Sequence, residues 1–342
     1  MTADPTLTPD EANAVTARRI AQITPLWLPE RAAGQRPVLV VIGGQPAAGK
    51  STAQELIRAA LDARRVAVYD RDDDPPAHPR FDPIMRANGV DGNLLVAEGL
   101  PPNLRDDCLD HLRSRQYDVI ASSPLQSEAA TRFWVDGFRP ENYRIAVVYI
   151  ATNEANSLLG IANRYQQAKD TVGYGRWLEK ELHDRAAAGM PDAAHAAEVQ
   201  GLVDDLYVVD RDGNVLYENH RGDDGVMPPP HRGRETILGE RNRPPTPAEH
   251  QWFLGTAVPL LDRAADLEPP VLQLVQTALR LHNERPAPEP LVRGSELRLD
   301  QRLADLRRIA GSGVAPPQIG TVAAADARPV GGRVSERRSL DR

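Results

Sequence analysis

One short segment of glycines and small residues constrains this sequence more than any other feature. It follows the apolar run 38–42, precedes a stretch with helical periodicity, and reads Gly44, Gln45, Pro46, Ala47, Ala48, Gly49, Lys50, Ser51 and Thr52. The residues up to Ser51 fit G-x-x-x-x-G-K-[ST], in which glycines let backbone N–H groups point at phosphate oxygens. Lys50 is expected to reach the β- and γ-phosphates, and Ser51 to hold Mg²⁺. The segment therefore predicts a nucleotide-binding loop between a strand and a helix.

The sequence around this loop alternates short apolar runs with helical patterns. Strand candidates are residues 38–42, 66–70, 118–121, 145–151 and 206–209, with a terminal hairpin completed by 215–217. After Ser51 the apolar positions Ala53, Leu56, Ile57, Ala60 and Leu61 fall on one face of a helix. This alternation is typical of an α/β fold with a mostly parallel sheet flanked by helices.

Composition divides the 342 residues into five stretches. These are a helical lead-in (1–36), the alternating α/β domain (37–219), a linker (220–248), a helical C-terminal extension (249–310) and a disordered tail (311–342). The lead-in begins at Thr8, a favourable N-cap directly before Pro9. The linker is predicted from its high content of proline and glycine, and the tail from its lack of an apolar period.

Charge and composition narrow the class of partner. A formal net charge of -7 argues against general nucleic-acid binding through a basic surface. Cys108 is the single cysteine, expected in the core, so no internal disulfide can form. We see neither a secretory signal nor an apolar run long enough for a membrane, and we expect a cytoplasmic location. No spacing of acidic, histidine or cysteine residues suggests a metal cage, so the expected metal is Mg²⁺ brought with the nucleotide.

An acidic run directly follows the second predicted strand. It contains Asp70, Asp72, Asp73 and Asp74. A carboxylate beside a phosphate loop can accept the proton of an attacking hydroxyl. The Asn-Lys-x-Asp signal of GTPases does not occur, and the other core strands lack the terminal aspartate of motor-type ATPases. These observations favour a P-loop kinase that transfers the γ-phosphate of ATP or GTP to a small molecule.

Several blocks of the sequence together resemble the zeta toxin family, P-loop kinases of bacterial toxin–antitoxin systems that phosphorylate a sugar hydroxyl of UDP-N-acetylglucosamine. The loop 44–51 is similar to the family's G-Q-P-x-x-G-K-[ST], and 70–82 is similar to its D-x-D followed by H-P-x-F-D. Residues 156–165 resemble the helix that ends in Arg-Tyr, and Gly175-Arg176 resembles the second arginine block. His183-Asp184 and the closing hairpin complete the likeness, which spans about residues 37–219.

The resemblance implies roles for individual residues. Asp72 would be the catalytic base, and Arg164 and Arg176 would hold the transferred phosphoryl group together with Lys50. His78 and Phe81 would lie at the acceptor, although the neighbouring proline and phenylalanine favour a packing role for His78. His183 is expected to pack or to hydrogen-bond within a helix. A protein antitoxin is a possible partner.

One block departs from the family pattern. Where the family has E-G-T-x-R after a core strand, this chain has Ser122, Ser123, Pro124, Leu125 and Gln126. Ser122 and Ser123 are therefore the candidate acceptor contacts, and the acceptor is either UDP-N-acetylglucosamine, a related nucleotide-sugar, or a different small molecule such as an antibiotic or a nucleotide. A nucleotide-binding regulatory module without turnover is the more distant alternative.

Overall fold

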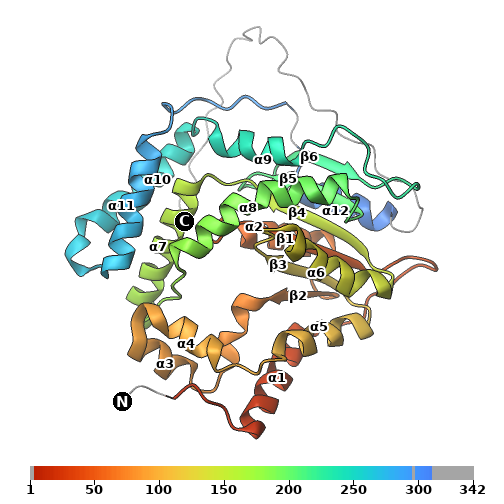
Figure 1. Cartoon of the computed structure of the whole chain (residues 1–342), viewed down its shortest axis with the longest axis horizontal. Helices are drawn as coiled ribbons and strands as arrows, with labels where there is room; N and C mark the ends of the chain where they lie inside the picture. The colour runs from red at the N-terminus through yellow and green to blue at the C-terminus, as the bar shows by residue number, and fades with distance from the viewer. Residues whose placement is uncertain (1–3, 295–296, 310–342) are drawn as a thin grey trace, which may run out of the picture.

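The centre of the protein is a six-stranded sheet in the order β2-β3-β1-β4-β5-β6. In the computed structural model, which describes residues 4–294 and 297–309, the strands are β1 (Val38–Gly43), β2 (Val66–Asp70), β3 (Asp118–Ser123), β4 (Arg144–Ile150), β5 (Asp205–Val209) and β6 (Val215–His220). The first five are parallel, and β6 runs antiparallel to β5. The predicted α/β fold is confirmed (Figure 1).

Helices cover both faces of this sheet. One face carries α1 (Pro9–Ile23), α5 (Leu104–Ser114), α6 (Glu128–Phe138) and α8 (Lys180–Val199), and the other carries α2 (Lys50–Ala60) and α12 (Leu299–Ile309). Alternate residues of β1 supply the two cores: Leu39 and Val41 face the first layer, whereas Val40 and Ile42 face the second. A central parallel strand buried on both faces requires such a continuous apolar run.

Two smaller groups of helices stand beside the sheet (Figure 1). The helices α3 (Phe81–Asn88) and α4 (Gly92–Glu98) share a small core of their own. A third core joins α7 (Glu154–Val172), α10 (Pro247–Asp262) and α11 (Pro269–Asn283). The predicted helical C-terminal extension is therefore present as α10, α11 and α12. Its first two helices pack on α7 as well as on each other.

Capping boxes mark the N-termini of two helices, α1 and α10. Thr8 accepts a hydrogen bond from the backbone N–H of Glu11, whose carboxylate returns to the backbone N–H of Thr8. The same capping box, formed by Thr246 and Glu249, starts α10. Each box satisfies N–H groups that a helix N-terminus otherwise leaves unpaired.

The expected linker 220–248 differs from the structure. Residues Gly233–Asn242 form the helix α9, which packs against α8, β5 and β6. Within α9, Ile237 is fully buried and Arg241 is 6% exposed. The sequence did not predict this helix, because it is short and polar and its few apolar residues do not repeat at helical spacing. The tail expected from residue 311 lies outside the described residues, and no helix within the described ranges is long and apolar enough to cross a membrane.

A buried chain of charges fastens α12 to the far edge of the sheet. Arg144 donates two hydrogen bonds of 2.8 Å to Asp205, and Nδ1 of His220 lies 2.8 Å from the same carboxylate. Arg302 of α12 donates to Glu218 at 2.8 Å. Burial opposes a charged imidazole, but the hydrogen bond to Asp205 and the negative charges of Asp205 and Glu218, the latter 3.7 Å from Nε2, raise the pKa of His220. Folding thus favours the protonated form of His220 more than the unfolded chain does.

We predict that this raised pKa makes stability depend on pH. A group whose pKa is higher in the folded state stabilises fully below its unfolded value of about 6.5, and the contribution is lost as the pH rises through the folded value. The free energy of unfolding of the wild type, relative to that of His220→Gln, should therefore be largest near pH 6 and should decrease as the pH rises. Urea unfolding at a series of pH values measures it, and a difference that grows with pH would contradict the assignment.

Candidate active site

The loop after β1 folds back on itself to form a phosphate cradle. Gly49 adopts φ 108° at the N-cap of α2, a conformation that favours glycine. The Nζ atom of Lys50 donates to the carbonyl oxygens of Gly44 at 3.0 Å and Gln45 at 3.3 Å. Ser51 lies exposed in the first turn of α2. The N–H groups of this turn and the helix dipole together favour an anion above the loop.

The side chain of Gln45 turns away from the cradle and holds the loop from behind. It is fully buried, donates from Nε2 to the carbonyl oxygen of Thr152 at 2.7 Å, and accepts at Oε1 from Arg241 of α9 at 2.9 Å. The hydroxyl of Thr152 donates to the carbonyl oxygen of Ala48 at 2.7 Å. The loop's backbone is therefore tied to the end of β4 and to α9, and Gln45 itself can bind a nucleotide only through its backbone.

A hydrogen-bonded series of serine, histidine and aspartate extends this support. Ser157 lies 3.3 Å from Nε2 of Gln45 and 2.8 Å from Nε2 of His183, whose Nδ1 is 3.0 Å from Asp184. Ser157 and His183 are fully buried, so neither can meet a substrate, and burial lowers the pKa of His183. The series is structural, as predicted for His183.

The acidic run forms a tight turn at the end of β2. The turn is the 3-10 helix η1 (Arg71–Asp73), and Oδ1 of Asp70 accepts from the backbone N–H of Asp72 at 2.9 Å. Asp74 is buried, where it accepts from Arg19 at 2.9 Å and from the Tyr69 hydroxyl at 3.2 Å. Asp74 is thus a structural carboxylate, while Asp70 and Asp72 face the phosphate loop.

Two arginines approach the acidic turn from the helical side. Arg176, in the segment after α7, makes an ion pair with Asp72, and Arg164 belongs to α7 itself. Partial burial raises the pKa of Asp72, but the hydrogen bond and charge of Arg176, with the charges of Lys50 and Arg164, lower it below its ordinary value. Asp72 is therefore ionised at neutral pH, and a cluster of three cations surrounds it.

The same cluster of charges also shifts the pKa values of Lys50 and Asp70. Partial burial lowers the pKa of Lys50, while the carboxylates of Asp72 and Asp70 act in the opposite direction. Burial, followed by repulsion from Asp72, raises the pKa of Asp70. The two neighbouring carboxylates are thus distinguished: the pKa of Asp72 lies below its ordinary value and that of Asp70 lies above it.

Glycine in α7 lets this helix approach the phosphate loop. A Cβ atom at Gly160 would lie 3.0 Å from the Cβ of Ala47. Gly160 is one turn before Arg164, so the contact that brings α7 against the loop also sets the height of the arginine above it. The four residues proposed from sequence as catalytic (Lys50, Asp72, Arg164 and Arg176) therefore converge.

The prediction that His78 contacts the acceptor is wrong. Its side chain is 2% exposed, its Nε2 lies 2.8 Å from the carbonyl oxygen of Pro5, and its Nδ1 accepts from the backbone N–H of Arg80 at 3.0 Å. Both ring nitrogens are thus used within the protein. Phe81 packs edge-on against Tyr174, with ring centroids 5.8 Å apart, and its contact with an acceptor stays a prediction.

Ser122 and Ser123 end β3 beside both halves of the site. The sheet register pairs Ser122 with Asp70 and Ser123 with Gly43. Ser122 is 8% exposed, and its hydroxyl is without a hydrogen-bond partner in the part of the chain that the structure describes. Leu125 is fully buried against the start of the phosphate loop. The block that departs from the expected pattern therefore packs as an apolar turn that holds no carboxylate.

Comparison with known proteins places this site in a family. The family model described as Zeta toxin matches residues 27–222. The chain belongs to the zeta toxin family. Curated relatives include a zeta toxin of Enterococcus hirae, 25% identical over 61% of this chain and 71% of that protein, and one of Streptococcus agalactiae, 23% identical over 62% and 72%. The resemblance predicted from the motifs is confirmed.

A solved structure shares the fold. A chain from the PezAT chromosomal toxin–antitoxin system of Streptococcus pneumoniae superposes with a TM-score of 0.59 at 15% sequence identity, covering 82% of this chain and 100% of that chain. The zeta toxin match confirms the P-loop kinase fold, and it leaves α9, α10, α11 and α12 outside the matched residues.

The residues that support the site from a distance carry no signal in the sequence. Arg241 and Thr152 hold Gln45, yet nothing in their local sequence marks them. Arg241 follows Gln45 by 196 residues and lies in the stretch interpreted as a linker. Covariation of Gln45 with Arg241 among relatives is the signal that could have found this pair.

We predict that Gln45→Leu, which keeps the side-chain volume, lowers the free energy of unfolding by roughly 2–3 kcal/mol. It removes the acceptor of a buried arginine and the donor to Thr152, and it should also weaken nucleotide binding because the loop loses its support. Urea unfolding and calorimetric binding of Mg-ATP measure the two effects. The exposed control Gln200→Leu should change neither. Wild-type stability in Gln45→Leu would show that the side chain does not hold the loop.

Proposed function

We propose that this zeta toxin family member is a kinase that transfers the γ-phosphate of ATP or GTP to a hydroxyl of a small molecule, with UDP-N-acetylglucosamine or a related nucleotide-sugar as the first candidate acceptor. The ion pair between Asp72 and Arg176, set beside Lys50 at the carboxyl edge of the sheet, carries the proposal. A nucleotide-binding module without turnover has no need for an ionised carboxylate at this position.

The residues divide the work of an in-line transfer. Lys50, Arg164 and Arg176 offset the negative charge of the transferred phosphoryl group, and the backbone N–H groups of the loop bind the remaining phosphates. Asp72, already an anion, accepts the proton of the attacking hydroxyl. In the structure Arg176 is paired with Asp72. If the guanidinium of Arg176 moved to the γ-phosphate of a bound nucleotide, the Asp72 carboxylate would be released to accept the proton of the hydroxyl.

Mg²⁺ fits the same arrangement. The hydroxyl of Ser51 is a hard oxygen ligand, exposed in the first turn of α2 next to Lys50. Bound there with a nucleotide, Mg²⁺ would supply positive charge to the β- and γ-phosphate oxygens. Within residues 4–294 and 297–309 there is no cluster of three histidine, cysteine or acidic side chains able to hold a metal by itself.

A different acceptor is the second candidate, and the loop after β3 favours it. Ser122 to Gln126 place neither a carboxylate nor an arginine at the edge where the acceptor would bind, and Leu125 fills the turn with apolar volume. The unpartnered hydroxyl of Ser122 is the polar group left there. An antibiotic or nucleotide-type acceptor is compatible with such a site.

A protein antitoxin is the partner that we propose. The support is family membership together with the fold shared with a chain from a toxin–antitoxin system.

We predict that Asp72→Asn lowers acceptor phosphorylation by about 10²–10⁴-fold and leaves the affinity for Mg-nucleotide nearly unchanged. Asparagine keeps the shape and removes the proton acceptor. Asp73→Asn is the matched control, because Asp73 is an exposed neighbour in the same turn. The pure protein is incubated with labelled ATP or GTP and either UDP-N-acetylglucosamine or a metabolite extract, and mass spectrometry identifies the product.

The outcomes separate the candidates. A labelled nucleotide-sugar supports the first acceptor, and another labelled metabolite supports the second. Nucleotide binding without any labelled product would contradict the kinase, and equal loss in Asp72→Asn and Asp73→Asn would contradict Asp72 as the base.

A further inference from the structure

A cavity of about 550 Å³ opens beside the phosphate loop, away from the acidic turn. Its walls include Arg211 from the β5–β6 turn, Asn156 from α7, and Glu249 and Trp252 from α10. The cavity adjoins the loop directly, because a Cβ atom at Gly49 would lie 3.1 Å from Cγ of Arg211. Its volume is in the range of small-molecule sites, about 300–1,000 Å³.

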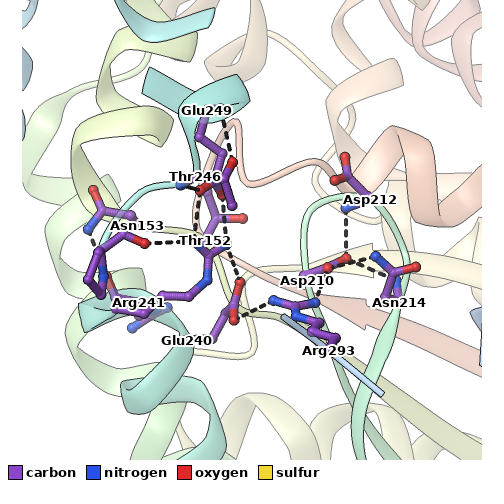
Figure 2. Close-up of polar contacts among 12 residues, drawn as sticks. Thr152, Asn153, Asp210, Asp212, Asn214, Glu240, Arg241, Thr246, Glu249 and Arg293 are labelled. Atoms are coloured by element: carbon purple, nitrogen blue, oxygen red, sulfur yellow. Dashed lines mark hydrogen bonds and ion pairs between the residues drawn. The ribbon is translucent and has the colours of Figure 1, made fainter. Parts of the chain in front are cut away.

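The β5–β6 turn holds Arg211 in place. The Asp210 carboxylate accepts from the backbone N–H groups of Asp212 and Asn214, both at 2.9 Å, and from the Asn214 amide at 2.9 Å (Figure 2). This closed turn points the Arg211 side chain between Gly49 and α10. The arginine is therefore positioned before any ligand arrives.

Arg211 and Trp252 form a flat stacking surface in the cavity wall. The guanidinium carbon of Arg211 lies 4.3 Å from the centroid of the Trp252 ring. Trp252 is 36% exposed, so part of this surface is open. Planar guanidinium and indole groups are the side chains on which nucleobases stack.

A buried hydrogen-bond acceptor lies in the same wall. Asn156 is 4% exposed, and its Oδ1 finds no hydrogen-bond partner among the residues that the structure describes. A buried amide oxygen without a hydrogen bond destabilises the protein, and a ligand with N–H or O–H donors would recover that loss. The hydroxyls of a ribose and the N–H groups of a base are such donors.

The charged side chains around the cavity are paired with one another within the protein. Ion pairs join Asp210 to Arg293 and Arg293 to Glu240 (Figure 2). Further ion pairs join Glu240 to Arg243 and Arg243 to Glu249. The charged lining residues are Arg211, Arg243, Arg293, Asp210, Asp212 and Glu249, three cations against three anions. A neutral nucleoside suits such a lining better than a polyphosphate does.

The strand order gives a bound nucleotide a direction. The acidic turn follows β2 on one side of β1, whereas Arg211 follows β5 on the other side. The phosphate loop follows β1, between them. A nucleotide whose γ-phosphate points toward Asp72 therefore extends its base toward Arg211 and Trp252.

We propose that this cavity binds the nucleoside half of the phosphate donor, with the base stacked on the Arg211–Trp252 pair and a base or ribose donor bonded to Asn156. Trp252 and Glu249 belong to α10, outside the residues that match the family model, so the C-terminal extension completes the donor site. The inference rests on the proposed function, because the phosphates must occupy the loop.

The test compares three probes: Mg-ATP, Mg-GTP and Mg-bound inorganic triphosphate, each titrated calorimetrically into the full chain. Trp252→Ala and Arg211→Met should lower the affinity for the preferred nucleotide by about tenfold or more and leave that for triphosphate unchanged. Arg211→Met keeps an unbranched stem against Gly49. Lys50→Ala should weaken binding of all three probes. The control is Trp27→Ala. Trp27 is 47% exposed, stacks beneath Arg64 and Arg65, and does not line the cavity. This substitution should leave the affinity for all three probes unchanged.

The two proposals fail differently. If the wild type binds triphosphate as tightly as ATP and GTP, or if the Trp252 and Arg211 variants keep wild-type nucleotide affinity, the nucleoside site is overturned while the phosphate loop stands. If the wild type binds none of the three probes, the donor assignment itself is wrong and the nucleoside site falls with it.

Discussion

The buried amide of Gln45 is the constraint on which the arrangement depends. A phosphate loop must expose its N–H groups on one side, so its own side chains cannot secure it there. Gln45 secures it on the other side, through Thr152 at the end of β4 and Arg241 of α9. The same amide reaches Ser157 and, beyond it, His183. Four separate elements therefore fix one loop, and the cations and carboxylates of the site are positioned relative to it.

The strand order of the sheet places the acidic turn and Arg211 on opposite sides of the phosphate loop. Strands β3 and β2 bring Ser122, Asp70 and the acidic turn to one side of the loop, and β4, β5 and β6 bring Arg211 to the other. Helix α7 crosses between them: its first turn carries Asn156 and its third carries Arg164, with Gly160 allowing the contact at the loop. One helix thus touches both halves of the donor site that we propose, while the proposed acceptor side depends on the loop after β3.

The sequence predicted what short-range patterns encode. The glycine-lysine motif, the N-cap at Thr8 and the continuous apolar run of β1 depend on neighbouring residues, and the structure has each of them. The partners of Gln45 could not be predicted, because Arg241 meets it only through the tertiary fold. His78 was misassigned for a related reason: a family motif does not distinguish a residue that packs from one that binds, and the carbonyl of Pro5 comes from the distant N-terminal segment. The helix α9 gave no signal because its buried residues are too few to set a period.

A crystal structure of the full chain with Mg²⁺ and a non-hydrolysable ATP or GTP analogue would show in one experiment which way the nucleotide lies. We expect the β- and γ-phosphates over the loop of residues 44–51, Arg176 turned from Asp72 toward the γ-phosphate, and the base against Arg211 and Trp252. A nucleotide that lies in the reverse direction, with its base beside Asp72, or that binds away from the loop, would contradict this expectation.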